Sequence, residues 1–264
     1  MLLEVKNLDV CYGNRLTIEN VNMQLDRGEI LSIVGESGSG KTTVVRAIMG
    51  CLPTNGHVSR GEISFEGENV LAYTSQQWRE SYGKKFSMIF QDSGSMINPI
   101  RKIGVQFIDY IRAHAPEKSR KDAETMAVKM LAKVNLPHPE GIMQSYPFQL
   151  SGGMNQRVGI AMAMFFSPKL LLADEPTSAL DVTTQAQIIR QIVDIRDEYQ
   201  AAVIMVTHNL GVASYVSNKI IVMKNGTIVE AGRREDIIYH PQHNYTKRLL
   251  AAVPTIGGKP YYER

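Results

Sequence analysis

The chain lacks long apolar runs and the features of an export signal. No stretch approaches the roughly 20 apolar residues that a membrane-spanning helix requires. Residues 1–6 have neither the basic flank nor the long apolar core of a secretory signal. We therefore expect a cytoplasmic protein that acts on a membrane, if at all, through a partner.

Cysteine and net charge are also sparse. The two cysteines, Cys11 and Cys51, are too few and too far apart to indicate a disulfide framework or a zinc site. The formal net charge is +3 and the basic segments at 118–121 and 233–234 are short, so nothing indicates nucleic-acid binding. With 264 residues, 44% of them hydrophobic and 21% charged, the chain fits one large α/β domain of a globular protein.

The first part of the chain has the pattern of β-structure followed by a strand, a glycine-rich turn and a helix. Short alternating runs, broken by turn signals at Gly13-Asn14 and Arg27-Gly28, predict an antiparallel β layer. Residues 30–34 are a continuous apolar run, which is typical of a strand buried on both faces. We expect a helix from about residue 42 to 49 after the turn.

The middle of the chain is rich in helix formers. Residues 121–134 place apolar side chains at helical spacing, and prolines punctuate the region. We predict a helical subdomain over residues 92–167. It is inserted into an α/β core formed by residues 1–91 and 168–240, and residues 241–264 form a C-terminal tail.

Strand patterns return after this region. Apolar runs at 170–173 and 203–206 flank an amphipathic helix, which predicts a βαβ unit and a parallel sheet. The dipeptide Asn225-Gly226 lies between two further strand-like segments and predicts a two-residue hairpin.

Residues 35–42 read Gly-Glu-Ser-Gly-Ser-Gly-Lys-Thr and match the phosphate-binding pattern G-x-x-x-x-G-K-[ST] at every fixed position. Its glycines let backbone N–H groups point at phosphate oxygens, and the following helix directs its positive end at the same anion. Lys41 can reach the β- and γ-phosphates of ATP, and the Thr42 hydroxyl can bind Mg²⁺. The residues predicted to hold the nucleotide here are Gly35, Ser37, Gly38, Ser39, Gly40, Lys41, Thr42 and Thr43.

Two carboxylates follow the strand predicted over residues 170–173. Asp174 suits a Mg²⁺ partner that acts through water, and Glu175 suits the base or positioning group for the attacking water. Alone, Asp-Glu after an apolar run is often only a helix N-terminal signal. Together with the phosphate-binding pattern, it indicates the second half of an ATP-hydrolysing site.

A third motif identifies a family. Residues 150–157, Leu-Ser-Gly-Gly-Met-Asn-Gln-Arg, resemble the signature of the ABC ATPases and lie between the two phosphate-site motifs. Further elements of that family occur in order at Tyr12, Gln91, residues 178–181 and His208. The resemblance covers nearly the whole chain. It implies an α/β fold with a P-loop NTPase core of mostly parallel sheet, an N-terminal antiparallel β layer and an inserted helical subdomain.

The resemblance also implies a role for each matching position within its own subunit. Tyr12 would stack on adenine, although alone it reads as a routine strand tyrosine. Gln91 would contact Mg²⁺ or the attacking water. His208 would hydrogen-bond the γ-phosphate, although a lone histidine after an apolar strand is more often a capped core residue.

Other matching positions would act on a second subunit. Ser151, Gly152 and Gly153 would contact the γ-phosphate of ATP held by a second ATPase subunit, and Asp181 would line the same interface. ATP would join two such subunits, and its hydrolysis would release them.

A narrower resemblance is to the ATPases of peptide and nickel importers. It rests on residues 84–92, 97–99, 103–104, 146–149, 154, 229–232, 240–246 and 249–254. Asp92-Ser93 replaces the usual Asp-Pro, and no cysteine follows Cys51, so we expect no iron–sulfur cluster. The short tail favours nickel or metallophore uptake, although the ATPases of short peptide importers would have the same short tail. His240 and His243 fit a structural tail better than a nickel site.

This subgroup implies several partners. They are a second ABC ATPase subunit, more often a different chain than a copy, two membrane permease subunits and, indirectly, an extracellular solute-binding protein. The protein would then sit peripherally on the cytoplasmic face of the cell membrane. Two alternatives stay open: an ABC ATPase that moves no solute, for which coiled-coil insertions or a second cassette are missing, and an ABC exporter subunit.

Overall fold

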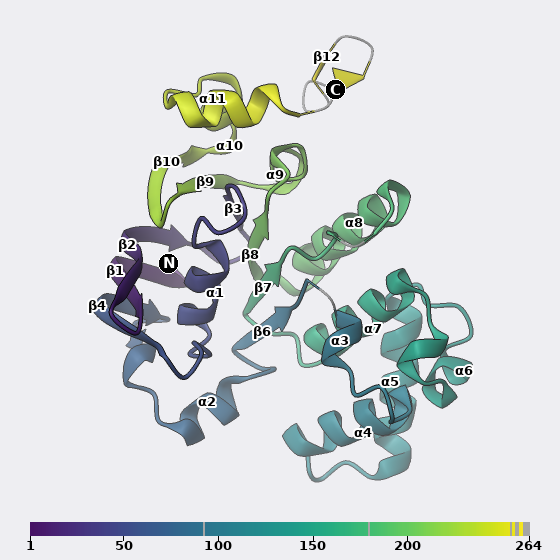
Figure 1. Cartoon of the computed structure of the whole chain (residues 1–264). Coiled ribbons are helices and arrows are strands. Elements are labelled where there is room, and N and C mark those ends of the chain that lie inside the picture. Colours follow the sequence, from purple (N-terminus) through teal and green to yellow (C-terminus); the bar gives the residue numbers. More distant parts are fainter. Residues whose placement is uncertain (92, 179, 254, 257–258, 261–264) are drawn as a thin grey trace. The chain divides into compact units, whose positions relative to one another are not determined.

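The computed structural model describes residues 1–91, 93–178, 180–253, 255–256 and 259–260, which form two compact units (Figure 1). The outer unit consists of residues 1–79 and 200–264, and the central unit of residues 80–199. The subdomain boundaries given above stay a prediction. Asp92, Ala179 and tail residues 254, 257–258 and 261–264 lie outside the described residues. No helix in the described part of the chain is both long and apolar enough to cross a membrane.

The outer unit contains the antiparallel β layer that the sequence predicts. Strands β1 (Leu3–Tyr12) and β2 (Arg15–Leu25) pair antiparallel, and β4 (Gly56–Phe65) pairs with the other edge of β1. The short β5 (Glu68–Asn69) completes the sheet order β2-β1-β4-β5. Every second residue of β1 at its start is buried, which gives the sheet one apolar face.

A second, mostly parallel sheet in this unit positions the phosphate-binding pattern. Strand β3 (Ile30–Val34) is buried at every position and pairs parallel with β8 (Ala202–Thr207) and β9 (Lys219–Lys224). Strand β10 (Thr227–Arg233) returns antiparallel to β9. The predicted hairpin is confirmed, because Asn225 and Gly226 have φ values of 48° and 84°.

The remaining elements of the outer unit are helices and short segments. They are α1 (Lys41–Ile48), η1 (Val70–Ala72), α9 (Leu210–Val216), α10 (Arg234–Tyr239), α11 (Asn244–Ala251), β11 (Thr255–Ile256) and β12 (Lys259–Pro260). Helix α2 (Ser75–Ser81) leads out of this unit.

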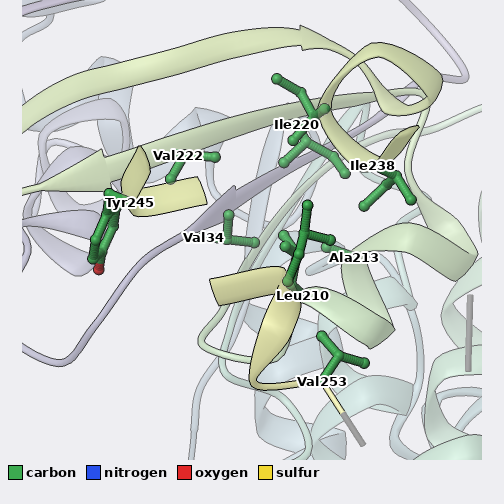
Figure 2. Packing of buried hydrophobic residues seen from close by; sticks show 10 residues of the cluster. Val34, Leu210, Ala213, Ile220, Val222, Ile238, Tyr245 and Val253 are labelled. Carbon is green, nitrogen blue, oxygen red and sulfur yellow. The ribbon is translucent and has the colours of Figure 1, made fainter. Parts of the chain in front are cut away.

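The C-terminal helices share an apolar cluster with the sheet. Figure 2 shows side chains of β3, β9, α9, α10 and α11 converging, with Tyr245 at one side and Val253 at another. The buried members are Val34, Leu210, Ala213, Ile220, Val222, Ile237, Ile238, Tyr245, Leu250 and Val253. The tail as far as Val253 is therefore packed into the core of the outer unit.

The central unit combines two parallel strands with a group of helices, whose colours run from blue through teal to green in Figure 1. Strands β6 (Phe86–Ile89) and β7 (Leu170–Asp174) pair parallel. The helices are α3 (Ser93–Met96), α4 (Ile103–His114), α5 (Arg120–Lys133), α6 (Pro139–Gln144), η2 (Pro147–Gln149), α7 (Gly152–Met164) and α8 (Val182–Tyr199). Helix α5 confirms the helix predicted over residues 121–134.

Aromatic side chains fill the space between α4 and the end of α7. The Tyr110 ring lies edge-on to His114 and to Phe166, with centroids 5.0 and 5.6 Å apart. Burial raises the pKa of Tyr110 to about 12, and it also lowers the pKa of His114, with the charge of Lys84 acting in the same direction.

Candidate nucleotide-binding site

The phosphate-binding pattern forms the loop between β3 and α1. Gly40 is the N-cap of α1, with φ 99° and ψ −1°, a left-handed conformation that glycine adopts without strain. A side chain would also lack room there, because a Cβ on Gly40 would lie 2.6 Å from Cγ2 of Ile18. The loop is thus shaped by the backbone freedom of glycine and by contact with β2.

The β9–β10 hairpin supports this loop from the side. A Cβ on Gly35 would lie 2.2 Å from the Met223 carbonyl oxygen, so the two backbones touch. The N–H of Gly226 donates to the Ser39 carbonyl at 3.1 Å. The hairpin therefore holds both the start and the middle of the loop.

Lys41 lies at the start of α1 and is 4% exposed. Its Nζ donates to the carbonyl oxygens of Gly35, at 2.9 Å, and Glu36, at 2.7 Å. These bonds fold the side chain back across the loop and place its positive charge beside the N-terminus of α1. Positive charge and backbone N–H groups together form an anion-binding arrangement.

Two more predicted residues lie near this loop. Tyr12 ends β1, and its hydroxyl shares a hydrogen bond with the Thr43 hydroxyl at 3.4 Å. His208 is exposed and directly follows Thr207, which pairs with Val34, the residue before the loop. The outer unit therefore brings Tyr12 and His208 to the same edge as residues 35–43.

The central unit gathers the other half of the predicted site. Ile89 pairs with Ala173, so two adjacent strands end side by side. Gln91 follows the end of β6, Asp174 is the last residue of β7, and Glu175 comes directly after it. Asp174 is 8% exposed, whereas Gln91 is exposed. This is the edge of a parallel sheet at which ligands bind.

Glu175 has an unusual backbone. Its φ of 46° lies in the left-handed region, which costs a residue with a side chain about 1–2 kcal/mol. The turn is held by Ser178, whose N–H and hydroxyl both donate to the Glu175 carbonyl, at 3.2 and 3.3 Å. Backbone strain maintained in this way often accompanies a functional position.

The signature residues begin α7. Ser151 is its N-cap and accepts a hydrogen bond from the Met154 N–H at 3.3 Å. A Cβ on Gly153 would lie 2.8 Å from Cγ2 of Thr184, at the start of α8. The N–H groups that begin α7 are therefore held close to the beginning of α8.

Asp181 caps the N-terminus of α8 with its carboxylate. It accepts bonds from the Thr184 N–H at 3.0 Å and from the Thr184 hydroxyl at 2.6 Å. The hydroxyl bond is the main cause that lowers the pKa of Asp181. Asp181 is thereby bonded to Thr184, the residue that a Cβ on Gly153 would meet.

Two hydrogen bonds beside the predicted site have no indication in the sequence. Gln156 of α7 is buried, and its Nε2 donates to the Phe90 carbonyl at 3.3 Å, so the signature helix holds the residue before Gln91. Tyr245 of α11 accepts the Glu36 N–H at 3.0 Å. Tyr245 lies within the quoted tail motif, but no local signal indicates its contact with the loop.

The strand, loop and helix of the outer unit have the arrangement of a P-loop nucleotide-binding protein. A family model described as ABC transporter matches residues 18–178, and the chain belongs to this family. It is an ATP-binding and ATP-hydrolysing cassette. The resemblance to the ABC ATPases, the fold class and the ATPase activity predicted from the sequence are confirmed.

Curated relatives indicate which members of the ABC transporter family this chain resembles. The oligopeptide transport ATP-binding protein OppD of Bacillus subtilis (strain 168) is 44% identical over 261 residues, covering 97% of this chain and 72% of that protein. The dipeptide transport ATP-binding protein DppD of Lactococcus lactis subsp. cremoris (strain MG1363) is 40% identical over 259 residues, covering 97% of this chain and 74% of that protein. The chain is thus similar to the ATPases of the peptide-importer subgroup.

Solved structures agree with the fold. One is a dimeric ATP-binding cassette in a post-hydrolysis state with ADP and Pi bound. It is 28% identical, has a TM-score of 0.77, and covers 88% of this chain and 99% of that chain. The cbiO1 subunit of an ABC transporter complex from Clostridium perfringens, 24% identical with a TM-score of 0.76, covers 90% of this chain and 91% of that chain and supports the fold alone.

Proposed function

We propose that this chain hydrolyses ATP to power the uptake of peptides by an ABC importer. The observation that carries the proposal is the loop of residues 35–40 with Lys41 folded across it, in a chain of the ABC transporter family. The solute class rests on the oligopeptide and dipeptide transport names of relatives that are 40–44% identical. These names favour peptides over nickel or metallophores as the solute class.

The residues of the outer unit would bind the nucleotide. Lys41 and the N–H groups of the loop and of the first turn of α1 would hold the β- and γ-phosphates. Tyr12 would stack its flat ring on adenine. To do so it would give up its hydrogen bond with the Thr43 hydroxyl, which is weak at 3.4 Å. His208 would hydrogen-bond the γ-phosphate.

Two oxygen donors would bind a magnesium ion. The hydroxyl of Thr42 and the carboxylate of Asp174 are hard ligands of the type that Mg²⁺ prefers, and both would hold it with water completing its shell. The ion would neutralise charge on the phosphates. Gln91 would contact either the ion or the attacking water.

Glu175 would act on the attacking water. The turn held by Ser178 fixes the direction in which this side chain leaves the end of β7. A carboxylate fixed there can accept a proton from water or orient it toward the γ-phosphate. We assign Glu175 as the catalytic base or positioning group.

A second ATPase subunit would complete each site. Ser151, Gly152 and Gly153 lie at the positive end of a 13-residue helix, and they would contact the γ-phosphate bound to the other subunit. Asp181 would lie at the same interface. We propose a heterodimer with a related ATPase, attached to two permease subunits on the cytoplasmic face of the membrane and served by an extracellular solute-binding protein.

ATP turnover by the native complex tests the solute class. The complex is purified through a tag on this chain, and its solute-binding protein is supplied loaded with short peptides or with nickel chelates. Peptide-dependent stimulation is the expected result. Stimulation by nickel chelates alone would refute peptide uptake, and a chain that purifies without membrane partners would favour a non-transport ATPase.

Lys41→Ala provides the control for turnover by this chain. We expect it to lower turnover at its own site by about 100-fold, the scale of a lost group that stabilises transition-state charge. Full turnover by this variant complex would show that the measured activity belongs to another subunit.

A further inference from the structure

We propose that Tyr245, in the C-terminal helix α11, is a positioning residue for the phosphate-binding loop. Its phenol oxygen accepts the Glu36 N–H at 3.0 Å, across 209 positions of sequence. The inference rests on the phosphate-binding role proposed above for residues 35–43. It assigns to the tail a function in ATP binding that the sequence motif did not suggest.

The contact acts on one peptide group. The N–H of Glu36 and the carbonyl of Gly35 belong to the same planar unit and point in opposite directions. Tyr245 binds the N–H end at 3.0 Å, and the Nζ of Lys41 binds the carbonyl end at 2.9 Å. Rotation of this peptide would break both bonds. Tyr245 therefore fixes the peptide plane, and through it the position of the Lys41 ammonium group.

The ring of Tyr245 has little freedom to move. It is 2% exposed and belongs to the apolar cluster of Figure 2, together with Val34 at the end of β3. Two cations lie over the ring: Nζ of Lys224 is 5.1 Å from its centroid and Cζ of Arg248 is 5.9 Å away. The phenol oxygen is thus held at the rim of a packed cluster, facing the loop.

Polar contacts fix the beginning of α11 as well. His243 is the N-cap, and its Nδ1 accepts the Tyr245 N–H at 3.1 Å. The Glu230 carboxylate on β10 accepts the N–H groups of Gln242, at 2.6 Å, and His243, at 3.1 Å. The helix that carries Tyr245 is therefore attached to the same hairpin that supports the loop through Gly226.

These contacts also explain why the tail holds a histidine at position 243. Its imidazole caps a helix, as the structural interpretation of the tail expects. Among the residues that the structure describes, no group of three or more His, Cys, Asp and Glu side chains could hold a metal ion.

The test is Tyr245→Phe, which keeps the buried ring and removes the oxygen. A contact made equally with bound substrate and in the transition state changes KM and leaves kcat unchanged. We expect the KM for ATP of the complex, and the Kd for ATP of the full chain, to rise about two- to tenfold, the range of one hydrogen bond. We expect kcat to stay within about twofold of the unaltered complex.

A residue that only stabilises the fold would behave differently. It would reduce the number of active sites, which lowers kcat and leaves KM unchanged. The proposal is refuted by an unchanged KM and Kd, whatever the effect on kcat. Because KM does not depend on the concentration of active sites, the readout holds even if part of the variant protein unfolds.

Tyr215→Phe is the matched control. Tyr215 lies on α9 in the same unit and is 60% exposed, so loss of its hydroxyl should change neither constant. Measurement of basal turnover separates this inference from the solute proposal, since no peptide is needed. Lys41→Ala with both unchanged ATP affinity and unchanged turnover at its own site would instead refute the phosphate-binding role on which the inference rests.

Discussion

Gly40→Ala is the substitution whose cost follows most directly from the structure. At φ 99° an alanine pays the left-handed penalty of about 1–2 kcal/mol. Its Cβ would also lie 2.6 Å from Cγ2 of Ile18, a fully buried β-branched side chain, and overpacking of this kind costs about 1–3 kcal/mol. The sum is about 2–5 kcal/mol, a large share of the roughly 5–15 kcal/mol that stabilises a typical domain.

Two other glycines allow the backbone penalty and the cost of the contact with Ile18 to be measured separately. Gly67 and Gly38 have φ values of +85° and +80°, and a Cβ at either would meet no atom within 4 Å. Gly67→Ala should therefore show the backbone term alone, away from the site. Gly38→Ala should show the same backbone term inside the loop. The difference between Gly40→Ala and these two is the cost of contact with Ile18.

Urea unfolding of the full chain measures the free energy of unfolding of all three variants. Titration with ATP measures how tightly each variant binds the nucleotide. We expect Gly40→Ala to lose about 1–3 kcal/mol more than either control and to bind ATP more weakly, because relief of the clash displaces the N-terminus of α1. Equal losses in the three variants would refute the reasoning, since the contact with β2 would then carry no energy.

Three further predictions concern residues of the site and its supports. Glu175→Gln should keep ATP binding but slow turnover by about 100-fold or more, trapping an ATP-bound dimer visible by size-exclusion chromatography. Gln156→Leu removes the bond to the Phe90 carbonyl. It should cost about 1–2 kcal/mol in urea unfolding and lower turnover, because Phe90 directly precedes Gln91, which is proposed to contact Mg²⁺ or the attacking water. Burial raises the pKa of Glu230, but the N–H groups of Gln242 and His243 outweigh it and leave the pKa below its usual 4.5. Its stabilising contribution should thus be present above about pH 4.5 and lost as the pH falls through the lowered value, and Glu230→Gln should remove this part of the pH dependence of unfolding.

Each of these has a result that contradicts it. Unchanged turnover by the Glu175 variant would remove that residue from its assigned role. A Gln156 variant with lower stability and normal turnover would show that its contact supports only the fold. For Glu230, the control is Glu19→Gln, which alters an exposed carboxyl group on β2. If Glu230→Gln and Glu19→Gln showed the same sensitivity to acid, the contacts with Gln242 and His243 could not be the cause.

Features encoded by neighbouring residues were predictable from sequence. The loop of residues 35–42 is contiguous, so its composition alone indicates a phosphate-binding shape. The Asn225-Gly226 hairpin is equally local, because both residues tolerate positive φ. The helix expected over residues 121–134 lies at 120–133 in the structure, a shift of one residue.

Features that depend on distant contacts were not predictable in this way. Strand β4 was missed, because its residues contain two glycines and no regular alternation of apolar and polar side chains, and it forms through pairing with β1. The contact of Gln156 with Phe90 spans 66 positions, and that of Tyr245 with Glu36 spans 209. A buried tyrosine in a tail has no local mark that distinguishes an ordinary core residue from one that positions a loop.

The hairpin at Asn225-Gly226 also limits how the chain can be engineered. Hairpin tips are usually preferred sites for inserting labels or opening the chain. Here the tip is enclosed: the Gly226 carbonyl accepts the Glu19 N–H at 2.9 Å, and a Cβ on Gly226 would lie 2.3 Å from the Thr17 carbonyl oxygen. A fluorophore or affinity tag inserted at this tip would disturb the loop that the hairpin supports, whereas the turn at Glu66-Gly67 is exposed and a Cβ on Gly67 would meet no atom within 4 Å.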